Sequence, residues 1–121
     1  MSVDIKTELA RRALLIIQDA ISQNAVQVAV QQTKFLVSIL APEIEEWEES
    51  EKSLLEGYLE NLDKKFEEFL NPKLEIENDV VPAELQAALA ERKRRELAND
   101  IYSCVNDVVK KLIKNCRGVF G

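Results

Sequence analysis

The most concentrated positive charge in the sequence is a run of four cations, Arg92, Lys93, Arg94 and Arg95. On an exposed helical turn, such residues can bind nucleic-acid phosphates or the acidic side chains of a protein partner. They can equally face the same chain, because residues 42–84 contain fifteen acids and four bases. No aromatic side chain lies among the cations to stack on bases, and the net charge of the chain is −6. Nucleic acid is therefore the less favoured partner.

The acidic counterpart of this run is the stretch EIEEWEES at residues 43–50. Its candidate partner-binding residues are Glu43, Glu45, Glu46, Trp47, Glu48 and Glu49. A bulky aromatic side chain inside an acidic rim can anchor a basic partner, because Trp is enriched among residues that dominate binding energy. In the structural interpretation, which we favour, Ile44 and Trp47 belong to the buried face of a helix and the glutamates are solvated.

Residue types that usually support catalysis or cofactor binding are missing. The sequence has no histidine, which removes the commonest general base, the usual catalytic triads, the common zinc sites and the Glu-x-x-His pairs of di-iron bundles. The three glycines, at positions 57, 118 and 121, form no phosphate-binding loop. We therefore expect no enzymatic activity, no cofactor and no metal site.

Two cysteines, Cys104 and Cys116, lie twelve residues apart in one expected helix. A helical rise of about 1.5 Å per residue separates them by roughly 18 Å, whereas a disulfide requires Cα atoms within about 7 Å. We expect two small, buried or half-buried hydrophobic residues in a reducing compartment. The alternative is a crosslink across a symmetric dimer.

The recurrence of apolar residues at steps of three and four predicts three long helices. Their bounds are about 3–40, with a possible break at 22–24, then 42–70 and 83–117, and residues 71–82 form a connector. Pro42 and Pro82 suit the start of a helix. Gly118 suits the left-handed position that closes one.

These elements predict one domain, residues 1–121, with an all-α fold: an antiparallel bundle of three long helices, or four if the first breaks, and no substantial sheet. The alternation of Val26, Val28 and Val30 also fits a strand, but no second strand is evident to pair with it. Apolar residues within 25–40 point in most directions around the helix axis. This segment therefore lies inside a four-helix core or is covered by a second copy of the chain, and we favour self-association.

Charges interrupt the apolar stripe of the last expected helix. Two apolar rows can be extended into this region. The row of residues 97, 101, 105 and 108 reaches Arg94 or Lys93 when it is extended backwards. The row that begins with residues 85 and 89 reaches Arg92 and Glu96 when it is extended forwards. Burying an unpaired charge costs several kcal/mol, so the helix must leave the core here or bend.

The sequence therefore predicts a non-catalytic helical interaction protein that self-associates and serves as an adaptor, an assembly component or a small regulatory binding protein. Its partner is expected to be a protein or a second copy of the chain. One alternative is a nucleic-acid-associated regulator that uses residues 92–95, and another is an acidic inhibitor or immunity-type protein that blocks a basic target. No apolar run approaches the roughly 18 residues of a bilayer span, and the N-terminus lacks the pattern of a targeting signal. We expect a cytoplasmic protein without membrane contact.

Overall fold

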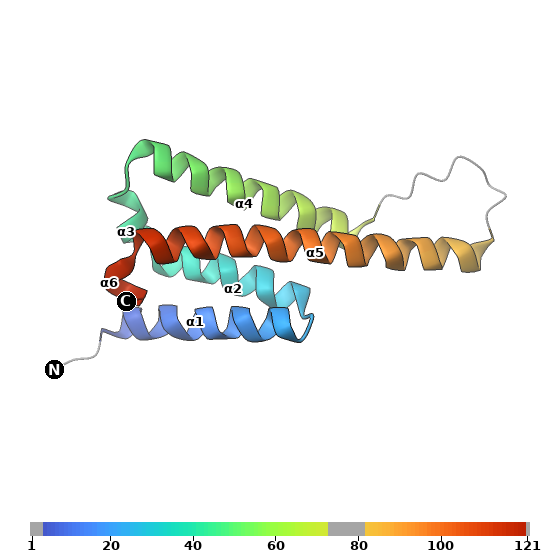
Figure 1. Cartoon of the computed structure of the whole chain (residues 1–121), viewed down its shortest axis with the longest axis horizontal. Coiled ribbons are helices and arrows are strands. Elements are labelled where there is room, and N and C mark those ends of the chain that lie inside the picture. The colour runs from blue at the N-terminus through green and yellow to red at the C-terminus, as the bar shows by residue number, and fades with distance from the viewer. Residues whose placement is uncertain (1–3, 73–81, 121) are drawn as a thin grey trace.

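The computed structural model describes residues 4–72 and 82–120, which are helical apart from turns (Figure 1). The helices are α1 (Ile5–Ser22), α2 (Val26–Ile39), α3 (Ala41–Glu45), α4 (Glu49–Leu70), α5 (Ala83–Asn115) and α6 (Arg117–Phe120). No strand occurs in the described ranges, and the all-α prediction is confirmed. Residues 73–81 of the predicted connector lie outside the described residues.

The long helices pack in the order α1, α2, α5 and α4. The pairs α1–α2 and α4–α5 are each antiparallel, and the two pairs join through α2 and α5 (Figure 1). The short helices α3 and α6 lie together at one end of the molecule. The predicted antiparallel helical bundle is therefore confirmed.

The turn between α1 and α2 sets the number of long helices at four. Asn24 has a backbone φ of 58°, a left-handed conformation that ends the helical path. The Tyr102 hydroxyl of α5 donates a hydrogen bond of 2.5 Å to Asn24 Oδ1, which attaches the turn to the neighbouring helix. Of the two alternatives for residues 3–40, one long helix or two, the structure has two helices with the break at 22–24.

This break changes which apolar residues of α2 are buried. Val26, Val30 and Leu36 face the core, whereas Val28 is exposed, although a continuous helix would have placed it in the buried stripe. The reason is that the non-helical turn resets the angular position of every residue after it. The strand alternative is wrong, because all of α2 is helical.

The predicted helix over 42–70 is wrong in its first part, because the chain divides it into α3 and α4. Pro42 lies in the first turn of α3 as expected, but α3 ends at Glu45, and Glu48 adopts an extended conformation before α4 begins. Ile44 and Trp47 both pack against the core at this end of the bundle. Burial of these two side chains favours a turn of the chain between α3 and α4. The sequence gives no local sign of this turn, because residues 46–48 contain neither Gly nor Pro.

Helix α5 contributes the largest part of the core. Its buried residues are Leu97, Ala98, Ile101, Cys104, Val105, Val108, Val109 and Leu112. None of the residues 83–96 is buried, and this part of α5 extends beyond the ends of α1 and α2 (Figure 1). Leu85 is 51% exposed. The expectation that the helix leaves the core is confirmed, whereas the placement of Leu85 and Leu89 in its buried face is wrong.

The end of α5 also differs from the prediction. The helix stops at Asn115, and Cys116 separates it from α6. Gly118 lies inside α6 and does not have a positive φ, so its prediction as a left-handed closing residue is wrong. Val119 is buried, and its carbonyl oxygen accepts a hydrogen bond of 3.2 Å from Arg11 Nε of α1. These contacts turn the chain back towards α1.

Candidate functional site

The acidic segment 43–49 lies at the end of the molecule that holds α3 and α6. Glu43 is half-buried and its Oε1 lies 2.7 Å from Lys6 Nζ of α1, while its Oε2 is buried without a hydrogen-bond partner. The other four glutamates, Glu45, Glu46, Glu48 and Glu49, are exposed. Glu49 also lies 3.5 Å from Lys52. The exposed carboxylates remain accessible to a partner.

Trp47 points into the bundle and not into the acidic rim. Its ring packs against the core, and its Nε1 is buried beside the Cys116 thiol. Burial raises the pKa of that thiol and the charge of Glu43 acts in the same direction, while the contact with Trp47 lowers it in part. This arrangement supports the structural interpretation of Trp47 as a core residue.

The basic segment 92–95 lies on the other side of the molecule, in the part of α5 that projects from the bundle (Figure 1). All four side chains are exposed. Arg92 pairs with Glu96 at 3.6 Å, and Arg95 pairs with Glu91 at 3.9 Å, as helical spacing predicts. Among the described residues, no ion pair joins these cations to α4. The structure therefore does not bring the acidic and basic segments together, and the nucleic-acid alternative for this segment stays a prediction.

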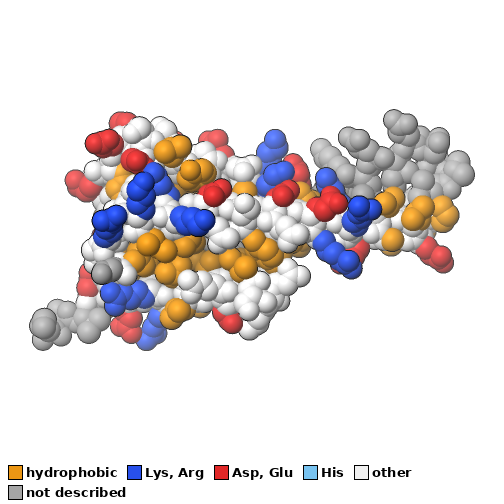
Figure 2. All heavy atoms as spheres, viewed as in Figure 1, with side chains coloured by type: hydrophobic (Ala, Val, Ile, Leu, Met, Phe, Trp, Pro, Cys, Tyr) orange, Lys and Arg blue, Asp and Glu red, His pale blue; other side chains and the backbone are white. Residues whose placement is uncertain are grey.

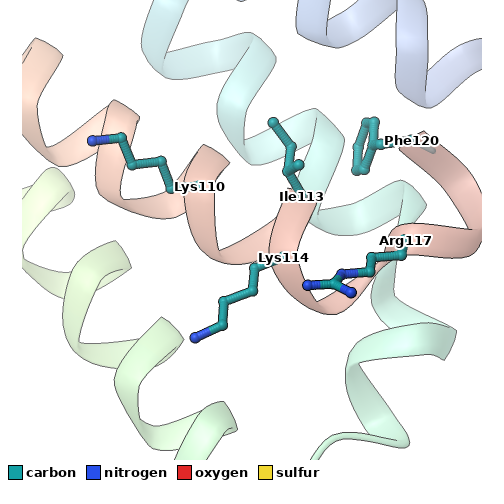
Figure 3. Close-up of a pocket in the computed structure, with 5 residues that line it drawn as sticks. All are labelled: Lys110, Ile113, Lys114, Arg117 and Phe120. Atoms are coloured by element: carbon teal, nitrogen blue, oxygen red, sulfur yellow. The ribbon is translucent and has the colours of Figure 1, made fainter.

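Sequence reasoning missed a depression at the junction of α5 and α6, with a volume of about 340 Å³. Its lining residues are Lys110, Ile113, Lys114, Arg117 and Phe120 (Figure 3). We call this depression the basic pocket. One signal was available in the sequence, because residues 108–121 contain four cations and no acid. Cations near the end of a helix are common, however, because they favour the helix dipole, and the turn that adds Phe120 depends on the fold.

The three cations of the basic pocket differ in environment from the adjacent Lys111. Lys111 is 12% exposed and pairs with Glu51 of α4, which also accepts a hydrogen bond of 3.3 Å from Asn115 Nδ2. These hydrogen bonds lower the pKa of Glu51, and the charge of Lys114 contributes weakly. No salt bridge to Lys110, Lys114 or Arg117 occurs in the described part of the chain. Their charges remain open to a partner.

A second accessible feature is a set of large apolar side chains on the surface. Within the described ranges they are Ile5, Leu9, Leu15, Ile16, Val28, Phe35, Leu54, Leu70, Leu85, Leu89 and Ile113. Six of these eleven belong to α1 and α2, the first two helices of the packing order. On the face shown in Figure 2, hydrophobic side chains also gather in a band between α5 and α1.

The described ranges offer neither a metal cluster nor a membrane-spanning helix. No group of three or more acidic or cysteine side chains within 4–72 and 82–120 could hold a metal ion. No helix in these ranges combines the length and the hydropathy that a bilayer span requires.

Comparison with known proteins gives this chain no relative. No protein-family model, no curated protein and no solved structure matches it.

Proposed function

We propose that this chain is a non-catalytic helical interaction protein that self-associates through the outer side of the α1–α2 pair. One observation carries the proposal: α1 and α2 expose large apolar side chains that no other described helix of the same chain covers. Ile5 is 72% exposed and Phe35 is 46% exposed. Exposed apolar patches of this kind are typical of protein–protein contact sites.

Helical geometry arranges these side chains in stripes. Ile5, Leu9 and Ile16 follow one another by four and seven residues, so at 100° per residue they lie along one side of α1. This stripe borders the buried face formed by Ala10, Ala13, Ile17 and Ala20. The apolar surface of α1 is therefore wider than the strip that its own chain covers.

The corresponding stripe of α2 consists of Val28 and Phe35, which are separated by seven residues. It lies on the side of the helix opposite its buried residues Val26, Val30 and Leu36. Half-buried Ile39 extends this stripe towards the end of α2. Each of the two antiparallel helices thus supplies an uncovered apolar side.

The charge distribution supports a second copy of the chain as the partner. In a two-fold symmetric interface the same surface meets itself, so any concentrated charge would face an equal charge. Residues 1–41 contain four bases and three acids, whereas residues 42–84 contain fifteen acids and four bases. The α1–α2 pair can therefore meet its own copy without the repulsion that the acidic segment would cause.

Light scattering on a sizing column tests this proposal. The wild-type chain is expected to give a mass of two or more copies at high micromolar concentration. The double variant Ile16→Glu/Phe35→Glu is expected to give the mass of a single chain, 13.8 kDa, because buried carboxylates oppose association. A single-chain mass for the wild type would refute self-association.

A matched control places the same charges on another surface. Leu54 and Leu70 of α4 are 47% and 52% exposed, so Leu54→Glu/Leu70→Glu introduces two carboxylates at comparably exposed sites. This control should retain the wild-type mass. If it dissociates equally, the α1–α2 pair is not the interface.

A further inference from the structure

We propose that the basic pocket, formed by Lys110, Ile113, Lys114, Arg117 and Phe120, is a docking site for an acidic amphipathic helix of a partner protein. The site is distinct from the α1–α2 stripes. The inference therefore does not depend on self-association.

The turn between α5 and α6 creates this pocket. Cys116 closes α5 with a backbone hydrogen bond of 2.8 Å to the Leu112 carbonyl oxygen. Buried Val119 and its contact with Arg11 then hold α6 against α1. As a result, Phe120 lies near the end of α5 and lines the same depression as Ile113.

The lining of the pocket has two chemically different sides. Figure 3 shows Ile113 and Phe120 on one side of the α5–α6 turn, while the side chains of Lys114 and Arg117 lie on the other. Lys110 is one turn earlier in α5. A complementary ligand therefore has an apolar side and an anionic side, which is the character of an acidic amphipathic helix.

Charge complementarity specifies the sign of that ligand. Lys110, Lys114 and Arg117 are exposed, and none of them forms a salt bridge with another described residue. The nearby carboxylate of Glu51 is held by Lys111 and Asn115. The chain as a whole has a net charge of −6, whereas the charged side chains that line this pocket are all positive. The pocket therefore attracts an acidic ligand.

The shape of the surface favours a protein segment over a small ligand or a membrane. Small-molecule sites enclose most of their ligand, but four of the five lining residues here are exposed. A bilayer surface requires a broad, projecting apolar face, whereas this site is a shallow depression with only two apolar side chains in its lining.

Fluorescence anisotropy with a defined peptide tests the proposal on the full chain. The probe is a labelled helical peptide with leucines at i, i+3, i+4 and i+7 and glutamates at the flanking positions. We expect salt-sensitive binding, and about tenfold weaker binding to Lys110→Glu/Lys114→Glu/Arg117→Glu, because opposed charges at an interface become like charges. The variant Ile113→Ser should also weaken binding without any change in net charge.

The triple reversal Arg92→Glu/Lys93→Glu/Arg94→Glu is a matched control, because it changes the net charge by the same amount on the projecting part of α5. It should leave peptide binding within about twofold of the wild type, since exposed charges beyond a Debye length of about 10 Å are largely screened. All variants alter exposed residues, and circular dichroism checks that their helices are retained.

Four results would overturn the proposal. They are no binding to the wild type at low salt, equal loss in the matched control, equal affinity for a peptide with glutamine in place of glutamate, and binding to phosphatidylserine vesicles that the pocket variant abolishes. The last result would assign the pocket to a membrane surface. Light scattering on the same samples measures self-association separately, so failure of one proposal is distinguishable from failure of the other.

Discussion

The turn at Asn24 allows a direct test of the four-helix architecture. Its φ of 58° lies in the left-handed region, and its side chain accepts the hydrogen bond from Tyr102. Burial raises the pKa of the Tyr102 phenol, so the hydroxyl stays protonated as a donor at neutral pH. We predict that Asn24→Ala destabilises the protein more than Asn24→Gly does.

The expected magnitudes follow from the two contributions. Both substitutions remove the Tyr102 hydrogen bond, which contributes about 1 kcal/mol. Alanine must also adopt the left-handed conformation at a cost of about 1 kcal/mol, whereas glycine adopts it freely. We therefore expect a loss of about 2 kcal/mol for Asn24→Ala and about 1 kcal/mol for Asn24→Gly. In an uninterrupted helix the order would be reversed, because glycine is about 1 kcal/mol less favourable than alanine there.

Urea denaturation followed by circular dichroism at 222 nm measures this difference. With a slope of about 1–3 kcal/mol per molar urea, 1 kcal/mol shifts the midpoint by roughly 0.3–1 M. Tyr102→Phe should cost about 1 kcal/mol in the wild type and almost nothing when Asn24→Ala is already present. An alanine variant equal to or more stable than the glycine variant would refute the left-handed turn.

The remaining predictions concern ionisable groups at the α4–α5 contact and in the core. Because Glu51 has a lowered pKa in the folded state, its contribution to stability is present at neutral pH and is lost as the pH falls below its ordinary value of 4.5. Glu51→Gln should therefore have a lower free energy of unfolding than the wild type at pH 7. In denaturant titrations carried out at acidic pH, this difference should shrink. Glu49→Gln, at an exposed site, should change the free energy of unfolding little at either pH. Cys104 and Cys116 are buried, and burial raises the pKa of both thiols. Both should therefore react slowly with a thiol reagent at pH 7.5 in the folded protein, and rapidly when urea unfolds it. Fast reaction of either thiol without denaturant would contradict its placement in the core.

Local features of the sequence determined the type and approximate extent of the helices. Apolar spacing identified the helical segments, and the prolines at 42 and 82 marked two helix starts, because proline restricts its own backbone wherever it lies. The polar stretch at 22–24 identified the only break that was expected, and the charges at 92–95 indicated that α5 leaves the core. Each of these inferences depends on residues within a few turns of one another.

Tertiary packing decided the features that depend on distant residues. The division between α3 and α4 follows from burial of Ile44 and Trp47 at the end of the bundle, and neither residue carries a local turn signal. The inward position of Trp47 likewise depends on the core that it meets. For the candidate site, the sequence identified the charged segments 43–49 and 92–95. It could not predict that the two segments lie at opposite sides of the molecule.

The basic pocket shows the same division between sequence and structure. The sequence supplied its cations, since residues 108–121 contain four bases and no acid. Only the fold turned α6 against α1, brought Phe120 beside Ile113, and paired Lys111 with Glu51 while leaving its neighbours open. Helix formation is governed by local backbone and side-chain preferences, whereas the choice of packing partners depends on which apolar surfaces the whole chain can bury together.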